Sequence, residues 1–222
     1  MHISKDINTF TNHYPYVGPI SWILCVQYFI VQLLVAGAWN VPHSWTHNTI
    51  SDLGNTVCGP YNERLVCSPL YTLMNLSFIV LGISMAVGSA LIYYGFKKSR
   101  LSYVGFSFMA LAGIGTWIVG AFPENTVGFM HGFGAALPFL FGNLSLLILG
   151  YNLDMPKLLR YYTLLSGITA LIALVFFVNK EYLIFGLGGM ERIVAYPQTI
   201  WMIAFGIYVS ANRYRKNVLS HK

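Results

Sequence analysis

The sequence predicts an all-α fold, a polytopic membrane bundle of six transmembrane helices forming a single domain over residues 1–222. Composition is the first observation: the chain is 56% hydrophobic and 9% charged, whereas soluble domains carry about 25% charged residues. The second is that the apolar residues gather in six runs, each close to the roughly 20 residues that cross a bilayer as a helix. The third is that most charges lie between these runs, as in membrane proteins.

The first apolar run covers about residues 20–41 and follows a long polar segment. Its core contains Ala36-Gly37-Ala38, which loosely resembles the cleavage site of a secretory signal. The length of the preceding polar segment favours a retained first span over a cleaved signal peptide.

Five further runs follow along the chain, and lipid offers no hydrogen-bond partners to their backbone groups, so each should be helical. The last run is the least regular, because Glu191 and Arg192 lie at its start. These runs cover about residues 69–95, 101–122, 127–150, 158–178 and 190–210.

The second and fourth spans share a faint repeat. Asn75-Leu76-Ser77 precedes Leu81-Gly82, and Asn143-Leu144-Ser145 precedes Leu149-Gly150 with the same spacing. A bundle that arose from a duplicated helical hairpin would show such a repeat. The alternative is coincidence among the few residue types that apolar helices use.

The distribution of Lys and Arg predicts the orientation, because these residues concentrate in cytoplasmic loops. With a cytoplasmic N-terminus, only Arg64, Lys180 and Arg192 lie outside. We therefore expect a multi-pass protein of the cell membrane, with both termini cytoplasmic and membrane lipids as partners. The net charge of +6 comes from these loops, so we expect no nucleic-acid binding. The cytoplasmic set is Lys5, Lys97, Lys98, Arg100, Lys157, Arg160, Arg213, Arg215, Lys216 and Lys222.

The longest loop covers residues 42–68 and is expected on the outer, oxidising side. It contains Cys58 and Cys67 with eight residues between them, and this location favours a disulfide over two reduced thiols. His43 and His47 in the same loop match the paired ligand spacings of a zinc site poorly.

Several motifs resemble those of a family of uncharacterised six-helix integral membrane proteins of prokaryotes. The first is Ser51-Asp52-Leu53-Gly54-Asn55, followed by Cys58-Gly59, Val66-Cys67-Ser68-Pro69 and Asn75. The second is Phe122-Pro123-Glu124 followed by His131, where many family members have aspartate in place of the glutamate. Glu191-Arg192 resembles a third, weaker motif. The resemblance implies the six-helix membrane fold over most of the chain, but no activity, because the family is a domain of unknown function.

Polar residues at the outer ends of the spans predict a functional site. His131 lies about 6–8 Å into the fourth span, and an ionisable side chain at that depth should face the bundle interior. We expect the outer polar residues to converge there as one site. The catalytic candidates are His131, Glu124 and Asp52, and the substrate-binding candidates are Arg192, Glu191, Asn75 and Tyr196.

This set of side chains suits hydrolysis or group transfer on a lipid headgroup. A carboxylate beside an imidazole raises its basicity, and an arginine binds phosphate or carboxylate through two parallel hydrogen bonds. Two carboxylates and a histidine could also hold a divalent metal, and no other cofactor is indicated. Each residue also has a structural interpretation: an ion pair for Glu191 and Arg192, a cap for Asp52, a solvated turn for Glu124, and interhelical hydrogen bonds for His131 and Asn75.

Three classes of function follow. The preferred one is an intramembrane enzyme acting on a lipid or lipid-linked substrate from the outer face. The first alternative is a non-catalytic immunity, sensor or assembly protein. The second is a small transporter, which Pro138 and Pro197 favour but the apolar middle of the spans disfavours. Gly128 and Gly132, spaced as GxxxG, would let another helix approach closely, so a protein partner or a homo-oligomer through glycine-rich helix faces is a further expectation.

Overall fold

A computed structural model of the protein describes residues 9, 11, 13–96 and 99–220, with side chains described up to residue 212. It confirms the all-α bundle, because six helical segments of the described residues are long and apolar enough to cross a membrane. They lie within a few residues of the expected runs at most of their ends. The spans are Val17–Gly37, Tyr71–Tyr93, Arg100–Ala121, Gly128–Asn152, Lys157–Val178 and Leu183–Asn212.

Three of the spans are interrupted or extended. The first consists of α2 (Val17–Ile23) and α3 (Val26–Gly37), and the last of η3 (Leu183–Phe185) and α9 (Gly186–Ser220). The fourth consists of α6 (Gly128–Leu137), the wider turn η2 (Pro138–Gly142) and α7 (Asn143–Asn152). The others are α4 (Tyr71–Tyr93), α5 (Arg100–Ala121) and α8 (Lys157–Val178).

The interruption at η2 begins at Pro138. A proline inside a helix lacks the N–H that the preceding turn needs, and its ring crowds the carbonyl four residues earlier. The wider turn accommodates both effects. The matching stretch of α4 is continuous, so the two spans differ in local structure, and the duplicated hairpin stays a prediction.

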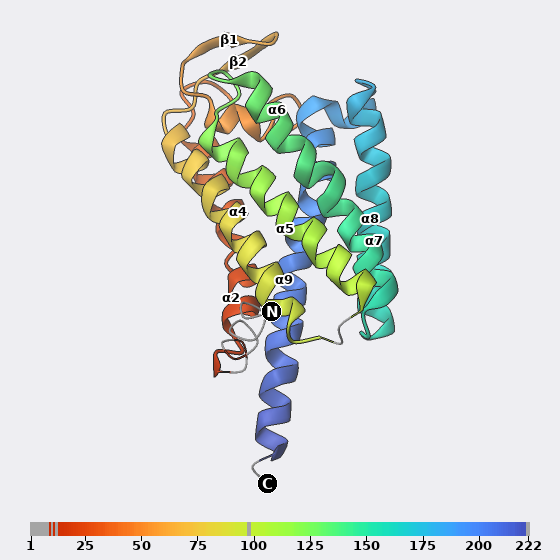
Figure 1. The fold of residues 1–222 in the computed structure, drawn as a ribbon. Coiled ribbons are helices and arrows are strands. Elements are labelled where there is room, and N and C mark those ends of the chain that lie inside the picture. Colours follow the sequence, from red (N-terminus) through yellow and green to blue (C-terminus); the bar gives the residue numbers. More distant parts are fainter. Residues whose placement is uncertain (1–8, 10, 12, 97–98, 221–222) are drawn as a thin grey trace.

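The core of the bundle includes an aromatic cluster between α2 and α9. The rings of Trp201 and Phe205 stack with centroids 4.8 Å apart, and Trp22 contacts both rings from α2. Alpha helices α4 and α5 approach closely, since a Cβ on Gly82 would meet the backbone of Gly113. In Figure 1, α9 runs beside both α2 and α8 and extends beyond the other helices at its C-terminal end.

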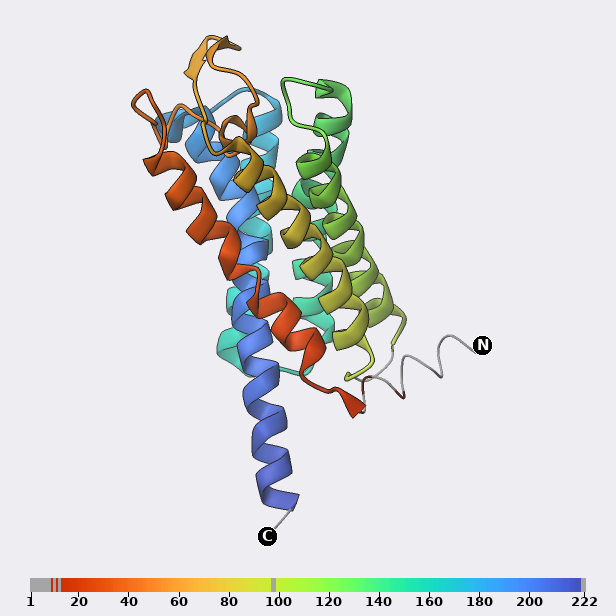
Figure 2. The ribbon, with the colours of Figure 1, turned by 90° about the vertical axis from the view of Figure 1, so that its left-hand side faces the viewer.

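The other end of the bundle carries a two-stranded hairpin formed by β1 (Gly59–Tyr61) and β2 (Arg64–Val66) (Figures 1 and 2). Asn62 and Glu63 join the strands with φ of 44° and 63°, as a type I′ turn requires. We call this end of the bundle the hairpin end.

The predicted disulfide is present in the structure, joining Cys58 and Cys67 across the base of the hairpin. The start of α2 and the last turns of α9 lie at the end opposite the hairpin (Figure 1), as an even number of spans requires. The side of the membrane on which each end lies stays a prediction. Part of its basis lies outside the described residues, namely Lys5, Lys97, Lys98 and Lys222, and the side chains of Arg213, Arg215 and Lys216.

The predicted GxxxG face is not used for packing within the described part of the chain. A Cβ placed on Gly128 or Gly132 would meet no atom within 4 Å, and the neighbouring Phe129 is 81% exposed. This face of α6 is therefore open to lipid or to another molecule, and the predicted oligomer or partner remains a prediction.

Candidate functional site

The loop of residues 42–68 rests directly on the first turn of α9. The backbone N–H groups of Gly188 and Gly189 donate to the carbonyl of Thr46, at 2.8 and 3.4 Å. A Cβ on Gly188 would collide with the carbonyl of Asn48, so only glycine permits this close approach. The contact holds the following segment, η1 (Ser51–Gly54), over the hairpin end of the bundle.

Asp52 and Thr49 fix the conformation of η1. The Asp52 N–H donates to Thr49 Oγ1 at 3.0 Å, and the Thr49 N–H donates to Asp52 Oδ2 at 2.9 Å. This reciprocal pair is a capping box, so the structural interpretation of Asp52 is correct. Asn75 holds the other end of η1, because its Nδ2 donates to the Gly54 carbonyl at 2.9 Å.

Asp52 also forms a bidentate ion pair with Arg64 of the hairpin. Arg64 Nε lies 2.8 Å from Oδ2, and Arg64 Nη2 lies 2.9 Å from Oδ1. Burial alone would raise the pKa of the Asp52 carboxyl, but hydrogen bonds from Arg64 and Glu124 and the charge of Arg64 lower it below its usual value. Asp52 is therefore an ionised carboxylate at neutral pH although its side chain is fully buried.

Glu124 lies beside Asp52 in the turn between α5 and α6. Thr56 and Asn125 hold this turn against the loop of residues 42–68 through two hydrogen bonds, of 3.2 and 3.0 Å. Burial, and then the hydrogen bond with the Asp52 carboxylate and its negative charge, raise the pKa of Glu124 to about 9. The two carboxyls therefore share a single negative charge at pH 7, and Glu124 is the protonated member.

His131 lies in the first turn of α6 and is buried, with 7% of its side chain exposed. Its Nδ1 lies 2.9 Å from the Phe122 carbonyl, and its Nε2 lies 2.9 Å from Ser51 Oγ. A carbonyl oxygen can only accept, so Nδ1 carries the proton and Nε2 offers its lone pair to the Ser51 hydroxyl. The sequence predicts a carboxylate beside this imidazole, whereas the structure has a backbone carbonyl there.

Ser51 is the functional candidate that the sequence analysis missed. Its Oγ lies 2.9 Å from His131 Nε2 and 3.3 Å from Glu191 Oε1, while Glu191 Oε2 accepts the N–H of Ile50. Ser51 is the first residue of the motif that carries the family resemblance, but a lone serine before an aspartate gives no signal of its own.

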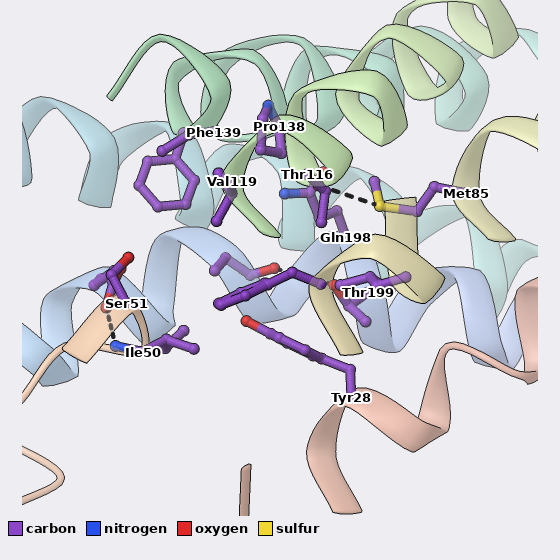
Figure 3. Close-up of a pocket in the computed structure, with 15 residues that line it drawn as sticks. Tyr28, Ile50, Ser51, Met85, Thr116, Val119, Pro138, Phe139, Gln198 and Thr199 are labelled. Carbon is purple, nitrogen blue, oxygen red and sulfur yellow. Dashed lines mark hydrogen bonds between the residues drawn. The ribbon is translucent and has the colours of Figure 1, made fainter. Parts of the chain in front are cut away.

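A cavity of about 40 Å³ lies in the interior of the bundle, and Ser51 and Glu191 are among the residues that line it (Figure 3). Polar groups of Thr116, Gln198 and Thr199 reach it, but apolar side chains form most of its wall. The volume suits a few water molecules. Most of the other lining residues come from α3, α4, α5, α6 and η2, among them Tyr28, Phe78, Met85, Val119 and Phe139.

The remaining candidates lie apart from this group. Within the described residues, Arg192 makes no ion pair with Glu191, so the ion-pair interpretation is wrong. Arg192 Nη1 instead donates to the carbonyls of Trp45, Asn48 and Gly188 at 2.9, 2.7 and 2.8 Å. Tyr196 donates its hydroxyl to Gln32 Oε1 at 2.7 Å.

The predicted single site is therefore divided into three groups of contacts. One joins Ser51, His131 and Glu191, the second joins Asp52, Arg64 and Glu124, and the third surrounds Arg192 and Tyr196. Asn75 supports the segment that links the first two.

A metal site is not formed by these side chains as they stand. The described residues contain no group of three or more His, Cys, Asp or Glu side chains arranged to hold an ion. Both oxygens of Asp52 accept from Arg64, and both nitrogens of His131 have partners. The divalent metal stays a prediction.

Comparison with known proteins gives one match. The model of a family described as "Protein of unknown function (DUF998)" matches residues 23–208, which include all the candidate residues. No curated protein and no solved structure matches the chain.

Proposed function

Because the chain belongs to the DUF998 family of proteins of unknown function, we propose its function from the site alone: an intramembrane serine hydrolase or transferase that acts on lipid esters. Ser51 is the nucleophile and His131 is its general base. Asp52, Arg64 and Glu124 are positioning residues that hold η1 over the bundle. With the orientation that the Lys and Arg residues predict, the site faces the outer leaflet.

The observation that carries this proposal is the 2.9 Å contact between Ser51 Oγ and His131 Nε2. A serine hydroxyl is a weak nucleophile unless a neighbouring base takes its proton, and an imidazole with its lone pair on the hydroxyl is the usual base. The Phe122 carbonyl fixes the required tautomer by accepting from Nδ1. The Phe122 carbonyl thus orients the imidazole, as the third residue does in a catalytic triad.

The reaction follows from this geometry. Ser51 Oγ forms a bond to the ester carbonyl carbon while its proton moves to His131 Nε2. The tetrahedral intermediate then releases the alcohol, whose oxygen takes the proton back from His131, and the acyl group remains on Ser51. Water in hydrolysis, or a second alcohol in transfer, attacks the acyl carbon and gives a proton to His131; the bond from Ser51 Oγ to the acyl carbon then breaks, the acid or the new ester leaves, and His131 returns the proton to Ser51 Oγ.

The surroundings of Ser51 favour a lipid substrate. Ser51 of η1 contacts the first turn of α6, at one end of a membrane span, and apolar side chains form most of the wall of the cavity that Ser51 lines. A lipid ester that reaches this level has its carbonyl near the serine, while its acyl chains stay outside the cavity, against the apolar outer faces of the helices. Glu191, whose Oε1 also approaches Ser51 Oγ, holds the backbone of Ile50 in place.

The experiment is covalent labelling of the purified full-length protein with a long-chain alkyl fluorophosphonate, followed by peptide mapping. This reagent reports an activated serine without knowledge of the substrate. We expect one adduct on Ser51, no adduct in Ser51→Ala, and at least a 100-fold slower rate in His131→Gln. Ser44→Ala, which removes another hydroxyl from the same loop, is the matched control and should label at the wild-type rate.

Absence of a Ser51 adduct in folded wild-type protein would overturn the proposal. So would equal rates in the wild type and His131→Gln, because the imidazole would then be a structural partner only. Thermal unfolding of each variant shows that a lost adduct does not reflect a lost fold.

A further inference from the structure

The guanidinium of Arg192 is held in place on one side, while the nitrogens of its other edge have no hydrogen-bond partner among the described residues. Its Nη1 donates to three backbone carbonyls, and its face lies 4.9 Å from the centroid of the Trp45 ring. Nε and Nη2 are buried and have no partner among the described residues, although only 7% of the side chain is exposed. These two atoms form the edge with which arginine binds two oxygens of one phosphate or carboxylate.

Arg192 also has no carboxylate within ion-pair distance among the described residues. Within the described part of the chain, Asp52 and Arg64 form the one ion pair whose nitrogen and oxygen atoms lie within 4.0 Å of each other. Arg192 forms no such pair. A buried, unpaired charge at the end of a membrane span is costly. An anion against the free edge would remove this cost.

A second unpartnered donor lies in the same groove. Gln32 of α3 is 1% exposed, and its Nε2 has no partner, while its Oε1 accepts from Tyr196. Gln32 and Arg192 both line a groove of about 300 Å³ between α3 and α9. The rest of the lining is largely aromatic or aliphatic: Phe29, Leu33, Trp45 and Tyr196.

We infer that this groove binds the phosphate of an anionic phospholipid, through Arg192 Nε and Nη2 and Gln32 Nε2. The acyl chains then run along α3, where Leu33 is 64% exposed. Three unpartnered donors belong to residues that line this one groove, and an apolar surface continues from them, which matches a phospholipid better than a free anion. The inference rests on the proposed function, because it names the substrate class of that site.

The groove and the Ser51 cavity are separated by a pair of rings. Tyr196 lines the groove and Tyr28 lines the cavity, and their centroids lie 6.4 Å apart. A phospholipid held by its phosphate at Arg192 therefore lies beside the wall of the cavity. An ester carbonyl of the same lipid lies a few bonds from the phosphate, which brings it toward Ser51.

The test is native mass spectrometry of the full chain with phosphatidylglycerol and with diacylglycerol of the same acyl chains, which lacks the phosphate. The wild type should retain phosphatidylglycerol at least tenfold better. Arg192→Gln should lose this preference, and so should Gln32→Glu, which keeps an acceptor for Tyr196 but replaces the donor with a carboxylate. Lys180→Gln, which removes an exposed cation at the same end of the bundle, should keep it.

Retention of the preference in folded Gln32→Glu or Arg192→Gln would overturn the inference. Displacement of the lipid by millimolar inorganic phosphate alone would identify a free-anion site and would overturn the phospholipid assignment. The same measurement in Ser51→Ala separates the two proposals, since that variant should bind phosphatidylglycerol as the wild type does. If the fluorophosphonate reaction fails but this binding pattern holds, only the proposed catalysis is wrong.

Discussion

Ser51 Oγ and His131 Nε2 lie 2.9 Å apart, although 80 positions separate the two residues in the chain. The hydroxyl has a second acceptor, Glu191 Oε1, at 3.3 Å, and its single proton can be donated to only one of the two. Glu191 is therefore both a support for the backbone of Ile50 and a competitor of the imidazole. Substitutions at Glu191 separate these two effects.

We predict that Glu191→Gln keeps the fold and the labelling of Ser51. The amide oxygen replaces the acceptor for the Ile50 N–H, and the amide N–H donates to Ser51 Oγ, so the serine proton is directed to His131. Glu191→Leu leaves the buried Ile50 N–H without a partner and should lower the unfolding free energy by about 1–3 kcal/mol. The measurements are thermal unfolding and the fluorophosphonate rate, and a rate in Glu191→Gln more than tenfold below wild type would contradict the prediction.

The ion pair of Asp52 with Arg64 gives a second prediction. Arg64→Gln leaves the fully buried Asp52 carboxylate without its cation, which should cost about 3–5 kcal/mol of unfolding free energy. Adding Asp52→Asn removes the uncompensated charge, so the double variant should be more stable than Arg64→Gln alone. Chemical unfolding in detergent tests this, and additive effects of the two substitutions would show that the pair contributes little.

The sequence was sufficient for the fold because membrane insertion leaves few choices. Runs of about 20 apolar residues must become helices, and their positions were predicted within a few residues at most ends. The disulfide followed from two cysteines in one outer loop. The interruption at Pro138 was not predicted, because a span can accommodate a proline either by small changes of the helical backbone or by a wider turn.

The sequence predicts which residues lie at one end of the bundle but not which of them contact each other. Depth along each helix places Glu124 and Glu191 at this end, and the loop that contains Asp52 can fold over it, but the contacts themselves come from the structure. Adjacent residues of a helix point in different directions, so Glu191 and Arg192 contact different partners. Arg64 and Ser51 were missed as site residues because their roles depend on how the hairpin and η1 fold back over the bundle.

The raised pKa of Glu124 predicts a pH-dependent stability. Below its ordinary value of 4.5, Glu124 is protonated in both the folded and the unfolded chain; between 4.5 and about 9, only the unfolded chain releases the proton. Stability from this group therefore falls as pH rises through that window. Asp52 acts in the opposite direction, because its pKa is lowered, and its contribution is lost in acid.

Thermal unfolding between pH 5 and pH 9 isolates the effect of Glu124. Glutamine has the shape of the protonated glutamate side chain and cannot ionise, so the melting temperature of Glu124→Gln should fall less across this window than that of the wild type. The difference should be about 2–4 °C for each kcal/mol of unfolding free energy. Glu63→Gln, in the exposed hairpin turn, should follow the wild type. Parallel curves for the wild type and Glu124→Gln would show that Glu124 is ionised in the folded protein.

The predicted orientation can be measured with single introduced cysteines, because the native cysteines should not react with a maleimide. Cys58 and Cys67 form the disulfide, and Cys25 is fully buried. Lys180→Cys, in an exposed loop at the hairpin end, should react with a membrane-impermeant maleimide in intact cells, whereas Lys157→Cys, at the opposite end, should react only after permeabilisation. The reverse pattern would place the hairpin in the cytoplasm, where a disulfide is not maintained. The lipid substrate would then come from the inner leaflet.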